Sequence, residues 1–248
     1  MHRLKLYGLL VGLMITILLI CDVLAFKIVS IGGHDLVASG IIFPFSFLFS
    51  SIITDVYGFK LAGRIIWIQL TCSALFILTI NLFVFLPSPE SANTATHYFA
   101  VFHNLWHVLI ASSIAVTSAY FINDVVMSKL KIYMSGRYFI IRFLISNAIG
   151  KAILVFISYP INFYGQYTAH YIVKIAINTW TYKMVIAILL FPVAILLSNI
   201  IKRIEKLDYF DYGVPYNPLT VFNEDAIGEN KYDKISQIKR QYRESYSA

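Results

Sequence analysis

Charge is scarce in this sequence, and its scarcity argues against a soluble domain. Asp, Glu, Lys and Arg make up 13% of the 248 residues, whereas hydrophobic residues make up 58%. A soluble domain carries about 25% charged and about 45–50% apolar residues, because its core needs a polar shell. This chain has too few polar residues to build that shell. Its composition therefore indicates an integral membrane protein, with the lipid bilayer as its surroundings.

Cysteine and short catalytic motifs are also scarce. Cys21 and Cys72 lie inside apolar runs and are too few for a disulfide framework or a zinc site. The sequence contains no H-E-x-x-H, no G-x-S-x-G and no G-x-x-x-x-G-K-[ST]. The missing G-x-S-x-G weighs little, because the partners of a triad can lie far apart in sequence. We expect no enzyme, no cofactor, no bound metal and no ATPase within this chain.

What the chain has instead is long apolar runs. A membrane-spanning helix needs about 20 mostly apolar residues, and six runs qualify: residues 7–30, 38–56, 62–86, 102–126, 139–159 and 175–201. We expect an all-α protein in which residues 1–201 form a six-helix transmembrane domain. Residues 202–248 are expected to form a charged, partly disordered cytoplasmic tail, with a short amphipathic helix at its end as the alternative.

Lys and Arg are distributed unevenly between the two sides of these runs. The side of the expected membrane that holds both termini carries Arg3, Lys5, Lys60, Arg64, Lys129, Lys131, Arg137, Arg142, Lys202, Arg203 and Lys206. The opposite side holds only Lys27 and Lys174. Cytoplasmic loops carry the excess of Lys and Arg, so both termini are expected in the cytoplasm. The net charge of +7 is for the same reason an orientation signal and not a nucleic-acid-binding surface.

Five ionisable residues interrupt the expected spans: Asp22, Asp55, Asp124, Lys151 and Lys183. A charge at the centre of a span costs at least about 2.5–3.5 kcal/mol, so such residues face a partner or a wet cavity. They come from five spans and have polar neighbours such as Thr54 and Asn147, which favours a central binding site. The alternative is that the acids and the lysines pair with one another inside the bundle. For Asp55, which lies near the end of its span, a further alternative is contact with water.

Lys151 stands alone in the middle of its span, where an unpaired ammonium is costly. Asp22 lies at a similar depth, in the middle third of the first span. We therefore expect Lys151 to be deprotonated or paired with an acid, and Asp22 is the nearest candidate for a buried ion pair. The alternative is that Lys151 faces the cargo or the aqueous path.

Three histidines cluster near the start of the fourth span. His103 and His107 are spaced i, i+4 and share a helical face, as metal or haem ligation requires, and His97 precedes them. No second span supplies an obvious carboxylate–histidine pair, and polar residues at the outer end of a span cost little. A membrane metal or haem protein that uses these histidines is an alternative interpretation.

The stretch FPFSFLFSSIITDVYGFKLAGRIIW, residues 43–67, resembles the signature of the queuosine precursor transporter family, also called the vitamin-uptake-like transporters. Further stretches are similar to that family: LAFKIVSIGG, INDVVMSKLK, TYKMVIAILLFP and FDYGVPYNPL. The resemblance covers nearly the whole chain, and its specificity lies in the order and spacing of the stretches. The matching residues of the first stretch are Phe43, Pro44, Phe47, Thr54, Asp55, Val56, Tyr57, Gly58, Lys60, Arg64 and Trp67.

The resemblance implies six helices and uptake of a small-molecule substrate, a deazaguanine base, across the bacterial inner membrane for salvage into modified tRNA. Cyano and aminomethyl precursors and queuine are the implied cargoes. Transport is expected to be secondary; a substrate-binding membrane subunit that needs an ATPase partner is the alternative. No oligomeric state is indicated.

A flat base needs aromatic faces and hydrogen-bond acceptors for its N–H edge. The expected acceptors are Asp22, Asp55, Asp124 and Asn147, and the expected faces are Phe43, Phe45, Tyr57 and Trp180. The full set of expected substrate-binding residues is Asp22, Thr54, Asp55, Tyr57, Asp124, Asn147, Lys151 and Lys183. Within this set, Asp55 accepts from the base or carries a coupling proton.

The chain departs from the family pattern at several positions. Ser51 stands where the family often has an acid, and Asp22 stands where it usually has Asn. Asn147 and Gly150 fall where the family tends to have Gln and an acid, with Lys151 beside them. Compared with the family pattern, this chain thus has one acid fewer in the second span and one more in the first. Because Lys151 is an added charge near the expected site, the identity of the cargo stays open.

Overall fold

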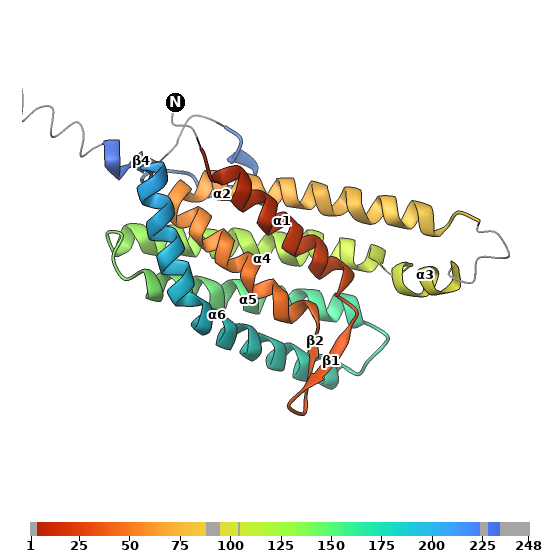
Figure 1. Cartoon of the computed structure of the whole chain (residues 1–248). Helices are drawn as coiled ribbons and strands as arrows, with labels where there is room; N and C mark the ends of the chain where they lie inside the picture. The colour runs from red at the N-terminus through yellow and green to blue at the C-terminus, as the bar shows by residue number, and fades with distance from the viewer. Residues whose placement is uncertain (1–3, 88–94, 104, 224–227, 234–248) are drawn as a thin grey trace, which may run out of the picture.

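Helices build most of the protein (Figure 1). The computed structural model describes residues 4–87, 95–103, 105–223 and 228–233. The helices are α1 (Tyr7–Val23), α2 (Ser39–Val84), α3 (Ala95–Phe102), α4 (Leu105–Tyr133), α5 (Phe139–Phe163) and α6 (Ala169–Glu205). Four of them, α2, α4, α5 and α6, are long and apolar enough to cross a membrane. The protein is therefore an all-α, multi-pass membrane protein, as its composition predicts.

Helix α2 is broken in its middle by Gly58. The backbone of Gly58 has φ 83° and ψ 172°, far from helical values, and separates residues 39–57 (α2a) from residues 59–84 (α2b). In Figure 1 the two halves run in opposite directions along the bundle. Two features require glycine at this position. The positive φ disfavours residues with a side chain, and a Cβ would lie 2.7 Å from Asp211 Oδ1. The two halves coincide with the expected spans 38–56 and 62–86.

The first expected span, residues 7–30, is wrong at its end. Helix α1 stops at Val23, and Ser30 belongs to β1 (Ile28–Ile31), which pairs antiparallel with β2 (His34–Val37). Gly32 and Gly33 form the turn with φ values of 59° and 79°, the pair of left-handed residues that a tight two-residue hairpin requires. Residues 24–26 form a turn after α1, the chain continues as a strand from Ile28, and the hairpin contacts α6.

Residues 206–223 pack across one end of the bundle. β3 (Tyr209–Phe210) pairs with β4 (Glu229–Asn230), and a 3-10 turn (Pro218–Thr220) follows β3. The indole of Trp67 donates to the Pro218 carbonyl at 2.9 Å, and Arg64 Nε donates to the Val221 carbonyl at 2.8 Å. The sequence allows a short amphipathic helix at the end of the tail, but residues 234–248 lie outside the described residues.

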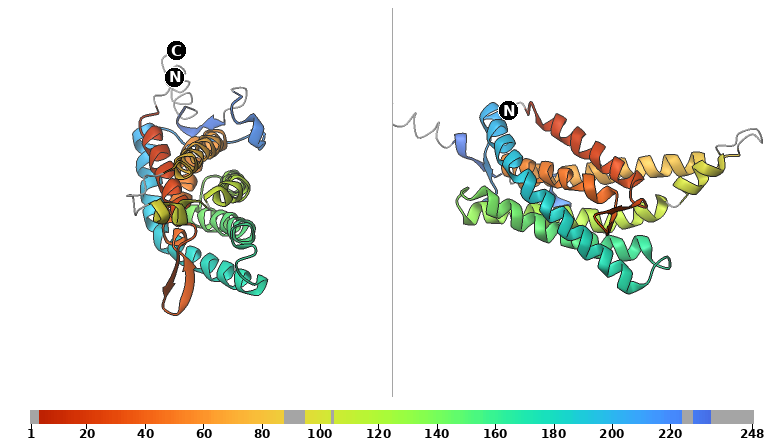
Figure 2. Two further views of the ribbon diagram at one scale, coloured as in Figure 1. Left: turned by 90° about the vertical axis from the view of Figure 1, so that its right-hand side faces the viewer. Right: turned by 60° about the horizontal axis from the view of Figure 1, so that its bottom comes forward.

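The bundle has two chemically different ends. The start of α1 and the end of α6 meet at one end, where the Leu6 N–H donates to Glu205 Oε1 at 2.6 Å. The β1–β2 hairpin and the α5–α6 turn lie at the opposite end, and Figure 2 (left) looks from that end along the helices. Close packing between the ends depends on small residues: a Cβ on Gly150 would lie 3.0 Å from the Ala119 carbonyl of α4.

Candidate functional site

A cavity of about 60 Å³ lies between α1, α2a, α4, α5 and α6, in the half of the bundle near the β1–β2 hairpin. Its polar lining comes from Asp22, Ser39, Ser158, Tyr159, Asn162 and Lys183. Ligand pockets usually measure about 300–1,000 Å³. The cavity in this structure is therefore smaller than a typical ligand pocket.

Two of the eight expected substrate-binding residues line this cavity, one acid and one base. Asp22 on α1 is 7% exposed, and its carboxylate accepts a short hydrogen bond from the Ser73 hydroxyl of α2b. Lys183 on α6 is 2% exposed, and its Nζ lies 4.7 Å from the centre of the Phe43 ring. Within the described residues, no ion pair joins Lys183 to a carboxylate. The cavity thus presents both an acceptor and a cation.

Lys151 lies beside the cavity, but not where the sequence analysis expects it. Its Nζ donates to the Lys183 carbonyl at 3.3 Å and lies 5.5 Å from the centre of the Phe47 ring. The expected ion pair with Asp22 is wrong, since the described structure contains no such pair. The two residues share a depth in the bundle but not a direction: α1 packs mainly on α2, whereas Lys151 on α5 faces α6 and α2a.

Aromatic rings form one wall next to these lysines. Phe47 stacks on Tyr120 with ring centroids 4.6 Å apart, and Phe43 lies 5.6 Å from Phe47. Among the four aromatic residues expected to supply faces, Phe43 lines the cavity. Phe45 is 41% exposed on the outside of the bundle, and the Trp180 indole donates to the Ala148 carbonyl.

A second polar group lies in the interior between α2a, α4 and α5. Ser50 donates to Asp124 Oδ1 at 2.7 Å, and Asn147 Nδ2 donates to the Ser51 hydroxyl at 3.0 Å. Thr54 donates to the Ser50 carbonyl one turn back. Three acceptor oxygens in this group are buried without a hydrogen-bond partner within the described residues: Asn123 Oδ1, Asp124 Oδ2 and Asn147 Oδ1.

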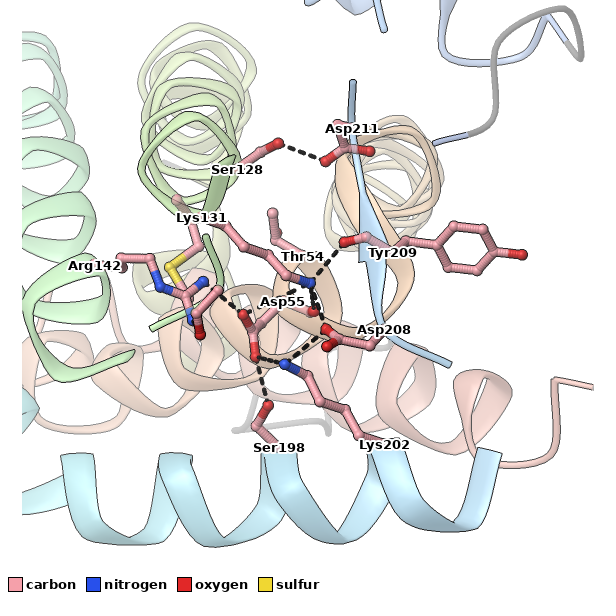
Figure 3. A network of polar contacts seen from close by, with 12 residues as sticks. Thr54, Asp55, Ser128, Lys131, Arg142, Ser198, Lys202, Asp208, Tyr209 and Asp211 are labelled. Atoms are coloured by element: carbon pink, nitrogen blue, oxygen red, sulfur yellow. Dashed lines mark hydrogen bonds and ion pairs between the residues drawn. The ribbon is translucent and has the colours of Figure 1, made fainter. Parts of the chain in front are cut away.

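Asp55 belongs to a third group, at the end of the bundle opposite the cavity. Arg142 Nη1 and Lys202 Nζ each lie 2.7 Å from its carboxylate, and Ser198 donates to it at 2.7 Å (Figure 3). Lys131 lies 4.0 Å away and binds the Asp55 carbonyl as well. Asp55 is 1% exposed, so it has no contact with water at the end of its span.

The tail completes this ion cluster. Asp208 lies 2.7 Å from Lys131 Nζ and 2.9 Å from Lys202 Nζ, so both lysines are shared by two acids. Asp211, three residues on, accepts from the Phe59 N–H and from Ser128, and burial raises its pKa. We name the set Asp55, Lys131, Arg142, Lys202 and Asp208 the ion cluster.

Tyr57 also lies at this end. Its hydroxyl donates to Glu205 Oε1 at 3.0 Å, and its ring meets the edge of Tyr7. Glu205 also accepts from the Lys5 and Leu6 backbone N–H groups. Tyr57 therefore ties α2a to both ends of the chain's helical part and does not reach the cavity.

The histidines have separate surroundings. His103 Nδ1 lies 2.8 Å from the Phe99 carbonyl and its ring stacks on Phe99, while His107 packs on Trp106. The side chain of His97 lies outside the described residues. Among the described residues, no group of three or more His, Cys, Asp or Glu side chains comes together.

The partners of Asp55 are not among the residues that the sequence predicts for a site. In the sequence, Arg142 and Lys202 indicate only orientation, and Asp208 belongs to the expected charged tail. A local signal was present for one pair, because Ser198 and Lys202 are spaced i, i+4 and face Asp55 together. The contact with Asp208 depends on the fold of the tail and has no local signal.

One comparison with known proteins finds a match. The family model described as "Putative vitamin uptake transporter" matches residues 37–197, well over half of the chain. No curated protein and no solved structure matches the chain. The matched segment contains Lys151, Lys183, Asp124 and the kinked helix α2, so it includes most of the cavity and the interior polar group. The chain belongs to this vitamin uptake transporter family.

Proposed function

We propose that the protein takes up queuosine precursors, deazaguanine bases or queuine, across the bacterial inner membrane. The observation that carries the proposal is the cavity between the helices, in which Asp22 and Lys183 stand beside Phe43. A carboxylate suits the N–H edge of such a base, and aromatic rings suit its flat face. Membership of a vitamin uptake transporter family supports a small-molecule cargo of this general kind.

The proposed topology has six spans with both termini in the cytoplasm. Gly58 divides α2 into halves of 19 and 26 residues, which a rise of 1.5 Å per residue makes about 28 and 39 Å long, against a hydrocarbon core of about 30 Å. With α1, α4, α5 and α6 this gives six crossings. Lys60, Lys131, Arg142 and Lys202 all lie at the end where the tail packs, which supports a cytoplasmic position for that end.

We propose secondary transport, with Asp124 as the residue that carries a coupling proton. Asp124 is 1% exposed and has no ion-pair partner among the described residues, and its Oδ2 lacks a donor. A proton on that oxygen would neutralise the carboxylate and so remove the cost of a buried charge that has no counter-ion. Asp55 is a poorer candidate for this role, because Arg142 and Lys202 at 2.7 Å hold it ionised.

Uptake by purified protein in liposomes tests the energy source. A proton gradient alone, without ATP or a partner protein, should drive accumulation of the base. Asp124→Asn should abolish accumulation but allow exchange of base for base, because exchange needs no net movement of protons. Absence of gradient-driven uptake by the wild type would favour the ATPase-dependent alternative.

Growth rescue tests the cargo. The protein is expressed in cells that cannot make queuosine, each precursor is supplied outside, and queuosine in tRNA is measured. We expect at least one deazaguanine precursor to restore queuosine in cells that express the protein. Cells that carry an empty vector should show no queuosine with any precursor. Lack of rescue by every precursor, in cells where the protein is inserted, would contradict the proposed cargo.

A further inference from the structure

Lys151 and Lys183 are buried amines without an ion-pair partner in the described structure. Lys151 is 0% exposed and Lys183 is 2% exposed, and neither lies within ion-pair distance of a described carboxylate. The buried Lys131 and the partly buried Lys202 are each held by Asp55 and Asp208. The buried Lys60 donates instead to the Asn223 carbonyl at the tail end of the bundle. Lys151 and Lys183 differ from Lys131 and Lys202 because no described carboxylate lies within ion-pair distance of them.

The immediate surroundings of the two lysines compensate for the missing acids only in part. An ammonium has three N–H donors, and Lys151 Nζ uses one of them, to the Lys183 carbonyl. The rings of Phe43 and Phe47 face the two ammonium groups at 4.7 and 5.5 Å. Such cation–π contacts contribute about 0.5–2 kcal/mol, less than the cost of an unpaired charge inside a membrane.

Lys183 is the member of the pair that faces the space where a ligand would sit. It lines the cavity together with Asp22, Ser158 and Asn162. Asp22 is engaged by the Ser73 hydroxyl and does not form an ion pair with Lys183 within the described residues. The amide oxygen Asn162 Oδ1 is buried and has no described donor. The cavity therefore has separate positions for an anionic group and for N–H donors.

We propose that the cargo is an anion, a deazaguanine-type base that carries a carboxylate, and that Lys183 receives this carboxylate. Lys151 adds positive potential from behind, through its position against the Lys183 backbone. The N–H edge of the base lies at Asp22 and Asn162, and Phe43 provides a face for the ring. This inference rests on the proposed uptake of deazaguanine bases and narrows their class to the acidic ones.

The test compares two bases that differ at one substituent, which is a negatively charged carboxylate in one and a neutral nitrile in the other. Binding of 7-carboxy-7-deazaguanine and of its neutral 7-cyano counterpart is measured on detergent-purified protein. The wild type should bind the carboxylate at least about tenfold more tightly, the factor expected for one charge-assisted hydrogen bond. Equal binding of the two bases, or tighter binding of the cyano base, would overturn the proposal.

Three variants locate the effect. Lys183→Met keeps the length of the side chain and should bring the affinity for the carboxylate down to the level of the affinity for the cyano base. Lys183→Arg keeps the charge and should retain the preference. Lys174→Met is the matched control, because Lys174 lies exposed on the same helix. A preference that persists in Lys183→Met would also overturn the proposal.

A second pair of ligands separates this inference from the proposed cargo. Benzoate and benzamide are aromatic and differ in charge, and neither resembles a deazaguanine. Benzoate alone should raise the unfolding temperature of the wild type and of Lys174→Met, but not of Lys183→Met. If both deazaguanines fail to bind while benzoate stabilises in this pattern, the anion site stands and the proposed cargo fails. If benzoate and benzamide act alike, the anion site fails.

Discussion

Asp55 and Asp124 are both 1% exposed, yet the charges around them differ. Asp55 contacts Arg142 and Lys202 at 2.7 Å and has Lys131 nearby. Asp124 contacts only neutral donors in the described structure, Ser50 and the Asn123 amide. A carboxylate among cations stabilises the fold by balancing them, whereas a carboxylate among neutral donors is free to exchange a proton. The same residue type is thus assigned two roles by its neighbours.

This contrast predicts different effects of one substitution at the two sites. Asp55→Asn removes the negative charge between the buried Lys131 and Arg142 and the partly buried Lys202, and breaking a buried ion pair costs about 3–5 kcal/mol. We therefore expect Asp55→Asn to lower the unfolding temperature of the purified protein markedly and to impair uptake through loss of folded protein. Asp124→Asn, the matched control, should unfold close to the wild-type temperature. Equal thermal stability of the two variants would contradict the structural role of Asp55, which would then return as a candidate for the coupling acid.

At the scale of elements, the break in α2 connects a span to the tail. Gly58 turns the chain, and the carboxylate of Asp211 occupies the place of its missing side chain and accepts from the next N–H, that of Phe59. A left-handed non-glycine residue costs about 1–2 kcal/mol, and the Asp211 contact adds a clash. Gly58→Ala should therefore be more destabilising than Gly165→Ala, because Gly165 has a similar φ of 77° but open space around it. Thermal unfolding of the two variants measures the difference, and equal losses would show that the tail yields easily at Gly58.

Local pattern predicted the helices well and their contacts poorly. Apolar length placed α4, α5 and α6, and Gly58 in the turn between two expected spans marked the break in α2. The strand at Ile28–Ile31 was missed because β-branched apolar residues suit a helix in a membrane and a strand alike. The pairing of Lys151 failed because depth along a span is readable from sequence, whereas the direction in which a side chain faces depends on how the helices pack. Arg142, Lys202 and Asp208 all lie far from Asp55 in sequence, so only the fold brings them to it.

The whole molecule places the cavity and the ion cluster in opposite halves. The cavity lies near the β1–β2 hairpin, and the ion cluster with the packed tail closes the other end. In the proposed topology the closed end faces the cytoplasm, so the described state retains the cargo site in the outer half. Under the proposed function, we expect release into the cell to require that the contacts of Asp55 and Asp208 with Lys131 and Lys202 separate.

This arrangement depends on the orientation of the chain, which reporter fusions test. The basic residues Lys60, Lys131, Arg142 and Lys202 gather at the tail end of the bundle, and the end with the hairpin carries Lys27. Because Lys and Arg remain on the cytoplasmic side during insertion, a reporter fused after Ser135 should be cytoplasmic and one fused after Ala92 should be external. Alkaline phosphatase, active only outside, and green fluorescent protein, fluorescent only inside, give opposite readings at each point. Reversal at both points would place the ion cluster outside the cell and the cavity in the cytoplasmic half of the protein. Two cytoplasmic readings would mean that the chain does not cross the membrane between Gly58 and Ser135 in the proposed way.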